Sequence, residues 1–408
     1  MISSGKTKKL LKSFSLYSSV LILAKIFSMF AQVIIGRQAG PEFYGQVTII
    51  MILANYLTLP MINGWGLAYV RLVSVHGHKQ CGDHNRQALK ALLVTILAAS
   101  LLTLFVLLFI GDWLTQKMDL TREILLLSVL LASMNAWWTL AKHIFQANQD
   151  WQTYSLVEFT WAMLLFCGIG IIATHAFSLQ ETISVFLFAY LVAGSIAARS
   201  IAKSIFASLR KDYVLEIVRH GSLLLSNAAI SGLAFGLDRL LINHYLEASE
   251  VGIYQAHFLA TYGTIATFSA MILNYLFPFF SQPVSENNTD ALINRWMYYV
   301  YPLVFITSFI SGWVMMTLFG YPISWPLLFL LSLFNPINFH GQVLAWKLAG
   351  AGVSTSKRIA FAQIVFLISS IVILLLSISS LGILAGGLSL LIASIITLVV
   401  LSQHFVPA

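Results

Sequence analysis

The side chains in this sequence that could do chemistry are few, and they interrupt long apolar runs. Lys25 lies near the middle of the first run, and Asp238 and Arg239 stand next to each other in a later one. If such runs cross a membrane, each charge costs at least about 2.5–3.5 kcal/mol on insertion scales and becomes a candidate for function. A lysine beside a water-filled space can hold a phosphate group as a point charge. The alternative for Lys25, snorkelling of its stem to the interface, is weakened by its central position.

Neighbouring residues on a helix project about 100° apart, so Asp238 and Arg239 should not share one face. We therefore expect Arg239 to contact a lipid headgroup or a diphosphate, and Asp238 to find its partner on another helix. The alternative is an ion pair that locks the helices together near the outer surface.

A further carboxylate and two cations stand near the ends of apolar runs. Glu158 lies a few residues into the fifth run, and we expect it to pair with Lys142 or Arg71. These two cations could receive an anionic ligand first, although anchoring at the membrane surface is the more frequent reason for basic residues there. Glu158 and Asp238 are also the candidates for coupling to an ion, or for a purely structural ion pair.

Amides and indoles inside the runs suit a hydroxylated ligand. Asn63 and Asn135 could line the path of a sugar, and the faces of Trp137, Trp138 and Trp161 could stack on its rings. The more common roles are hydrogen bonds between helices, worth about 0.6 kcal/mol each, and aromatic belts at the membrane interface.

The composition identifies the elements that must position these residues. The chain has 408 residues, of which 59% are apolar and only 9% are charged, against about 45–50% and 25% in globular proteins. This excludes a soluble enzyme and a disordered chain, and two cysteines are too few for a disulfide framework. The roughly 240 apolar residues would fill about twelve membrane helices.

The apolar runs divide into two sets of six. They lack the alternation of barrel strands, so we expect an all-α polytopic membrane protein of about 12 transmembrane helices. The two halves are predicted as six-helix bundles at 1–211 and 212–408. The expected spans are 14–36, 44–70, 88–110, 123–146, 154–174, 182–204, 220–243, 252–280, 296–319, 322–346, 359–378 and 381–402.

The basic residues fix the expected orientation. With twelve spans, 18 of the 23 Lys and Arg fall on the side of the N-terminus and only three, Arg37, Lys117 and Arg122, on the other. Because cytoplasmic loops are rich in Lys and Arg, both termini are predicted to be cytoplasmic. The net charge of +8 is then a property of topology, and nucleic acid is excluded as a partner.

An internal repeat links the halves. Gly45 and Gly252 are 207 residues apart, and each follows a short loop with a Glu and opens the second helix of its half. Since both halves begin on the same side, the repeat is parallel. Repeats of this kind are typical of transporters whose two bundles rock about a central site.

These motifs resemble the polysaccharide-export branch of the MOP exporters. The resemblance is carried by GPEFYG at 40–45 and GL-AYVR at 66–71, and in the second half by LDRLL at 237–241, SEVGIY at 249–254 and LFPFFS at 276–281. It implies two bundles around a central cavity, as in the multidrug and toxic compound extrusion transporters. It also implies a bacterial inner-membrane flippase similar to the O-antigen (Wzx-type) flippases. The implied substrate is an undecaprenyl-diphosphate-linked oligosaccharide, flipped from the cytoplasmic to the periplasmic leaflet by alternating access.

Energy would come from an H⁺ or Na⁺ gradient or the membrane potential, with no cofactor. The implied partners are the membrane lipids and the polymerase and chain-length regulator of the same pathway. No nucleophile elbow, phosphate loop or metal cluster is present in the sequence, so we expect no enzyme.

Two other functions remain open. A multidrug cation antiporter would require acidic residues in the cavity, whereas the central charge here, Lys25, is positive. An O-antigen polymerase typically carries a large periplasmic loop, and the longest outer loop expected here has about 12 residues.

Overall fold

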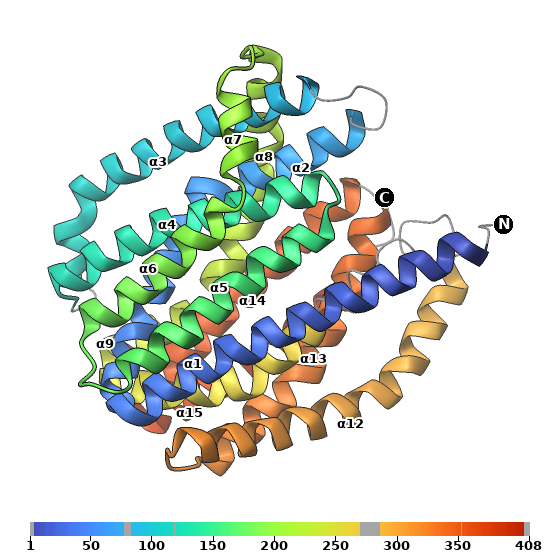
Figure 1. Cartoon of the computed structure of the whole chain (residues 1–408). Coiled ribbons are helices and arrows are strands. Elements are labelled where there is room, and N and C mark those ends of the chain that lie inside the picture. The colour runs from blue at the N-terminus through green and yellow to red at the C-terminus, as the bar shows by residue number, and fades with distance from the viewer. Residues whose placement is uncertain (1–3, 77–82, 118–119, 270–285, 352, 404–408) are drawn as a thin grey trace. The chain divides into compact units, whose positions relative to one another are not determined.

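The structure is a computed structural model that describes residues 4–76, 83–117, 120–269, 286–351 and 353–403. Its elements in this part of the chain are helices, which confirms the predicted all-α class (Figure 1). The predicted eighth run is described only as far as residue 269, and the motif at 276–281 lies outside the described residues.

The described chain divides into two compact units. The first comprises the residues up to Gln38 together with Ile49–Gly232, and the second comprises Ala39–Thr48 and the chain from Leu233 onward. The predicted six-helix bundles at 1–211 and 212–408 stay a prediction, since these units divide the chain differently.

The first helix runs through both units. It is α1, Ser4–Thr58, and it is kinked at Gly40, whose φ of 86° and ψ of 170° are not helical. Glycine adopts a positive φ without steric penalty, and Pro41 is compatible with the first turn of the helical segment that follows. The predicted loop between the first two runs is therefore reduced to a kink.

The remaining elements of the first unit follow in order. They are a π-helical turn η1 at Leu59–Asn63, α2 at Gly64–His76, α3 at Asp83–Lys117, α4 at Arg122–Ala147, α5 at Trp151–Ile172, α6 at Leu179–Ser195, α7 at Ala198–Ile205 and α8 at Lys211–Ala234. Helix α6 packs against both α4 and α5. Helix α8 packs on α2, where a Cβ on Gly64 would lie 2.4 Å from the backbone oxygen of Gly221.

The second unit contains the rest of the chain. Its elements are α9 at Leu237–Tyr245, α10 at Ala248–Phe258, a π-helical turn η2 at Leu259–Gly263, α12 at Glu286–Phe319, α13 at Trp325–Ala351, α14 at Val353–Leu381 and α15 at Leu384–Ser402. Helix α15 packs against α13 and α14. The predicted seventh run, 220–243, is broken between α8 and α9 at Phe235–Gly236.

Three helices of the first unit begin at caps that the sequence supplies. The Thr121 hydroxyl accepts the backbone N–H of Ile124 at α4, Asp150 accepts that of Thr153 at α5, and Ser178 accepts that of Glu181 at α6. Side chains of this kind satisfy N–H groups that the first helical turn leaves unpaired. The caps fix where α4, α5 and α6 start, and therefore which of their residues face one another.

Eight of the described helical segments are long and apolar enough to cross a membrane, or nine if the bent pair α6 and α7 is one span. One of the eight, Tyr17–Val73, has 57 residues. Fully helical, that length is about 85 Å, against a hydrocarbon core of about 30 Å, so its two arms provide two crossings. Large apolar side chains are exposed on the outside, such as Leu108 with 83% of its surface accessible. The chain is a multi-pass membrane protein.

Candidate functional site

Lys142 of α4 and Glu158 of α5 form an ion pair in the first unit. The two helices are joined by a three-residue turn at 148–150, which returns the chain so that these side chains meet. The Nζ–Oε1 distance is 3.1 Å, and each side chain is 18% exposed. The prediction that Glu158 pairs with Lys142 is confirmed. Arg71, the other predicted partner, is exposed and makes no ion pair with any described residue.

Aromatic rings surround this pair. The Lys142 Nζ lies 3.3 Å from the centroid of the Trp138 ring. The ring centroids of Trp138, Trp161 and Tyr190 are 5.0–5.6 Å apart, and the rings of Trp161 and Tyr190 are stacked. The cation–π contact holds the ammonium group while leaving its other N–H donors available.

Two polar groups inside this aromatic group have no partner. The indole N–H groups of Trp138 and Trp161 are buried and make no hydrogen bond to any described residue. A buried donor without an acceptor costs about 1–3 kcal/mol, so unpaired donors in a native protein call for an explanation. The sequence marked both tryptophans but could not place them beside Lys142.

Lys25 belongs to the same neighbourhood. It is partly buried on α1, and the Glu158 carboxylate acts on it electrostatically, as it does on Tyr17, Tyr154 and Tyr190. Glu158 therefore pairs with the amine of Lys142 and acts electrostatically on that of Lys25. We call Lys25, Lys142, Glu158, Trp138, Trp161 and Tyr190 the unit 1 cluster.

In the described chain the two predicted amides, Asn63 and Asn135, are not hydrogen-bonded to each other. The Asn135 amide of α4 donates to the Asn55 oxygen of α1 at 3.1 Å, and the Thr58 hydroxyl beside it reaches the Ala132 backbone oxygen at 3.3 Å. Asn135 is thus a hydrogen-bonding link between helices. Asn63 is partly buried in the π-helical turn η1. Such turns are frequent at functional sites, and a sugar contact for either amide stays a prediction.

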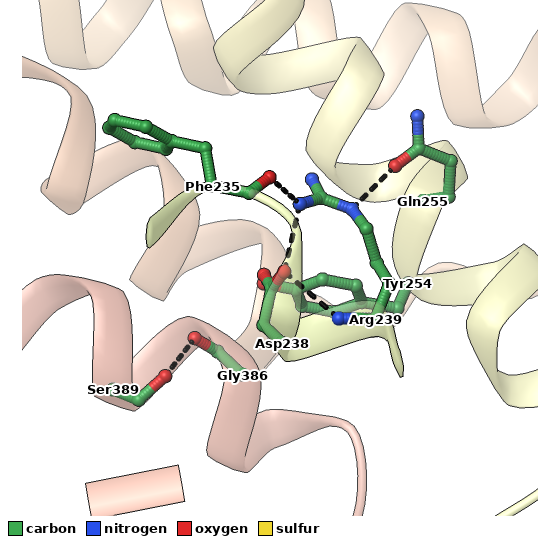
Figure 2. Close-up of polar contacts among 7 residues, drawn as sticks. All are labelled: Phe235, Asp238, Arg239, Tyr254, Gln255, Gly386 and Ser389. Atoms are coloured by element: carbon green, nitrogen blue, oxygen red, sulfur yellow. Dashed lines mark hydrogen bonds and ion pairs between the residues drawn. The ribbon is translucent and has the colours of Figure 1, made fainter. Parts of the chain in front are cut away.

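Asp238 and Arg239 form a buried pair in the second unit, as Figure 2 shows. The Arg239 Nη1 lies 2.9 Å from the Asp238 Oδ1, and the side chains are 3% and 1% exposed. The expectation that Asp238 has its cationic partner on another helix is wrong. It assumed a continuous helix, whereas the chain breaks at Phe235–Gly236 and both residues stand in the first turn of α9. There the guanidinium folds back over the start of the helix, and the two residues form the ion pair that the alternative predicts. That this pair locks the helices near the outer surface stays a prediction.

The remaining bonds close this network. The Asp238 Oδ2 accepts the Tyr254 hydroxyl at 2.7 Å, the Arg239 Nε donates to the Gln255 Oε1 at 2.8 Å, and the Arg239 Nη1 also donates to the Phe235 backbone oxygen. The guanidinium carbon lies 3.8 Å from the centroid of the Phe258 ring. A buried ion pair is tolerated when both charges also have hydrogen-bond partners. Removing one of the two residues would leave an unpaired buried charge and would lower the stability of the protein. The assignment of Arg239 as a substrate contact stays a prediction.

Helix α15 fits tightly against the same network. A Cβ on Gly386 would lie 2.6 Å from the Tyr254 ring. Ser389 donates its hydroxyl to the Gly386 backbone oxygen at 2.9 Å, as drawn in Figure 2. Tyr254 and Gln255 are not predicted from the sequence, although Tyr254 ends the motif at 249–254.

The repeated glycines meet each other in the second unit. A Cβ on Gly45 would lie 1.8 Å from the Ala248 backbone oxygen, and one on Gly252 would lie 1.9 Å from that of Pro41. The contact is reciprocal. The backbone oxygen of Pro41, four residues before Gly45, faces Gly252, and that of Ala248, four residues before Gly252, faces Gly45. The glycines that opened the second helix of each half in sequence thus allow two backbones to touch.

Comparison with known proteins agrees with these features. The family described as "Polysaccharide biosynthesis protein" matches residues 10–284. No curated protein sequence matches the chain. Among solved structures, the lipid II flippase MurJ in an inward closed conformation is similar, with a TM-score of 0.63 and 14% identity over 95% of this chain and 86% of that one. The MATE multidrug transporter DinF-BH has a TM-score of 0.63 and 14% identity over 98% and 96%.

The two solved structures share the fold with this chain, and the family match covers more than half of its length. The chain belongs to the polysaccharide biosynthesis protein family.

Proposed function

We propose that this protein flips an undecaprenyl-diphosphate-linked oligosaccharide, the O-antigen repeat unit, from the cytoplasmic to the periplasmic leaflet of the bacterial inner membrane. The observation that carries the proposal is the unit 1 cluster. Its two amines, those of Lys25 and Lys142, can donate hydrogen bonds to a diphosphate, and they attract it when both are protonated. Its aromatic faces and unpaired indole N–H groups suit sugar rings and their hydroxyl oxygens.

The ion pair provides a mechanism of exchange. In the structure Glu158 is paired with Lys142. An arriving diphosphate carries more charge than one carboxylate and displaces Glu158 from the ammonium group. The released carboxylate then takes up H⁺ or Na⁺, which couples the flip to an ion gradient. The polyprenyl tail stays in lipid during the flip, and the polymerase and chain-length regulator receive the product.

The family match favours this proposal over a multidrug antiporter, although the fold serves both. An antiporter for cationic drugs needs a carboxylate that can face the drug. Two carboxylates deep in the described helices, Glu158 and Asp238, are each already paired with a cation.

Complementation tests the proposal. Wild-type protein, Lys25→Ala, Lys142→Gln and Glu158→Gln are expressed at matched levels in flippase-null strains from several O-antigen backgrounds. We expect wild type to restore surface polysaccharide in at least one background and all three variants to lose most of that activity. Lys117→Gln, which removes an exposed cation outside the cluster, serves as the control and should behave as wild type.

Two results would contradict these expectations. Resistance to cationic drugs without polysaccharide export in any background would establish the antiporter instead. Full export by all three cluster variants would keep the flippase but refute the cluster as its binding site.

A further inference from the structure

Helix α7, near the middle of the chain, is a short helix of the first unit that is bent away from the helix before it. Helix α7 leaves α6 at an angle of 61° and is too short to cross a membrane on its own (Figure 1). Ile201 and Ser204 form its buried side. The Lys90 ammonium group of α3 donates to the backbone oxygens of Ile205 and Ala207 at 2.8 and 2.6 Å. These bonds satisfy carbonyls at the end of α7, so its orientation is set by the fold.

The opposite side of α7 is exposed and basic. Arg199 and Lys203 lie one helical turn apart on this side, both are exposed, and neither makes an ion pair with any described residue. Lys211 is also exposed. Positive charge on this side is thus not neutralised by the protein itself.

Large apolar side chains lie among these cations. Phe206 is 90% exposed, Ile205 54% and Leu209 45%. Because Arg199, Lys203 and Phe206 follow one another at intervals of four and three residues, they lie on one face of the helix. We call Arg199, Lys203, Ile205, Phe206, Leu209 and Lys211 the α7 surface.

The chain beyond this surface is also fixed. The Arg210 guanidinium donates to the Tyr213 hydroxyl at 3.0 Å and pairs with Asp212 at 3.2 Å. The Tyr213 hydroxyl lies within hydrogen-bonding distance of the His84 ring of α3. The end of the α7 surface is therefore held to α3 at two places, by Lys90 and by His84.

We propose that the α7 surface binds the headgroups of bulk anionic phospholipid at the membrane interface. Amphipathic segments that combine exposed aromatic or aliphatic side chains with Lys and Arg lie in the plane of the interface. The apolar side chains enter the acyl boundary while the cations remain at the level of the phosphates. Unpaired cations favour an anionic lipid over a zwitterionic one, and each contributes roughly a fivefold preference near the surface.

A polyprenyl diphosphate also carries phosphate, so the experiment distinguishes it from bulk anionic lipid. In a protein without cysteines (Cys81→Ser, Cys167→Ser), the exposed Ala202 is changed to Cys and labelled with a fluorophore. The protein is placed in nanodiscs of phosphatidylglycerol and phosphatidylcholine, one of which is brominated high on the acyl chain. Quenching measures which lipid lies beside the label.

We expect brominated phosphatidylglycerol to quench at least tenfold more effectively per mole than brominated phosphatidylcholine. The double variant Arg199→Gln, Lys203→Gln should remove most of this preference, leaving the smaller contribution of Lys211. The matched control Lys117→Gln, Arg122→Gln removes the same charge from exposed residues elsewhere and should keep it. If undecaprenyl diphosphate displaces the brominated lipid at a lower mole fraction than phosphatidylglycerol does, the surface selects the diphosphate, and its assignment to bulk anionic lipid is refuted. Equal displacement supports bulk lipid.

Three further results would overturn the proposal. They are equal quenching by both lipids in the wild-type surface, equal loss of preference in both double variants, and a label quenched by aqueous iodide but by neither lipid. Since none of these measures export, the proposal stands or falls independently of the proposed function.

Discussion

At the scale of single residues, the ion pair of Lys142 and Glu158 lies between the exposed and the fully buried kind. With 18% of each side chain exposed, its stabilising effect is partly screened, and removing one partner should cost about 1–2 kcal/mol. The cation–π contact with Trp138 keeps Lys142 in place without Glu158. A role in transport can therefore be separated from a role in folding.

We expect Glu158→Gln to reduce polysaccharide export at least tenfold while the protein stays folded, because glutamine keeps the shape but can neither be displaced as an anion nor take up a coupling ion. Export is measured at matched expression, and folding by thermal unfolding in detergent. The double variant Lys142→Gln, Glu158→Gln is the control. If it exports normally, the pair only balances charge, and the exchange mechanism is refuted.

The pair of Asp238 and Arg239 should behave in the opposite way. Asp238→Asn leaves a buried guanidinium without its counter-ion and should lower the free energy of unfolding by about 3–5 kcal/mol. Tyr254→Phe removes only one hydrogen bond to the carboxylate and should cost about 1 kcal/mol. Thermal unfolding measures both. Asp112→Asn, which breaks an exposed pair with Arg122, should change nothing measurable, and an Asp238→Asn protein as stable as this control would contradict the prediction.

The same residues show what the sequence could and could not predict. Lys142 and Glu158 were paired correctly because both stand near one end of two helices joined by a short turn. Asp238 was placed wrongly because only Gly236 marks the break that brings Arg239 back onto it. The aromatic rings around Lys142 come from α4, α5 and α6, and no spacing within one helix reveals which rings meet.

At the scale of helices, the contact of Gly45 with Gly252 sets how closely two segments approach. Gly252→Ala would place a methyl group 1.9 Å from the Pro41 backbone oxygen. Backbone cannot move aside as a flexible side chain can, so the helices must separate, and we expect a loss of about 1–3 kcal/mol of stability. Gly45→Ala should have a similar effect, since the contact is reciprocal.

A helix glycine with free space around it is the control for this prediction. Gly170 of α5 has nothing within 4 Å of an added Cβ, so Gly170→Ala should be neutral or stabilise by up to about 1 kcal/mol. Thermal unfolding of the three variants is compared. Equal effects of Gly252→Ala and Gly170→Ala would mean that the close contact does not bear on stability.

At the scale of the whole molecule, the span number follows from adding sequence and structure. Nine spans are counted when α6 and α7 are one crossing and Tyr17–Val73 is one helix. The kink at Gly40 makes that helix two crossings, and the segments around α8–α9 and α10, which the sequence predicts as the seventh and eighth spans, bring the number to twelve. An even number is what places both termini on the same side.

The bent pair of α6 and α7 is the least regular part of this topology. Whether the pair crosses the membrane is therefore the most informative test of the number of spans. His175 and Ser208 are exposed on either side of it. In a protein without other cysteines, we expect His175→Cys to react with an impermeant maleimide in intact cells, and Ser208→Cys only after permeabilisation, because the basic residues around α7 should stay cytoplasmic. Lys117→Cys, on the predicted outer side, should react as His175→Cys does. If His175→Cys and Ser208→Cys instead react from the same side, α6 and α7 form a re-entrant loop, and the number of spans becomes odd.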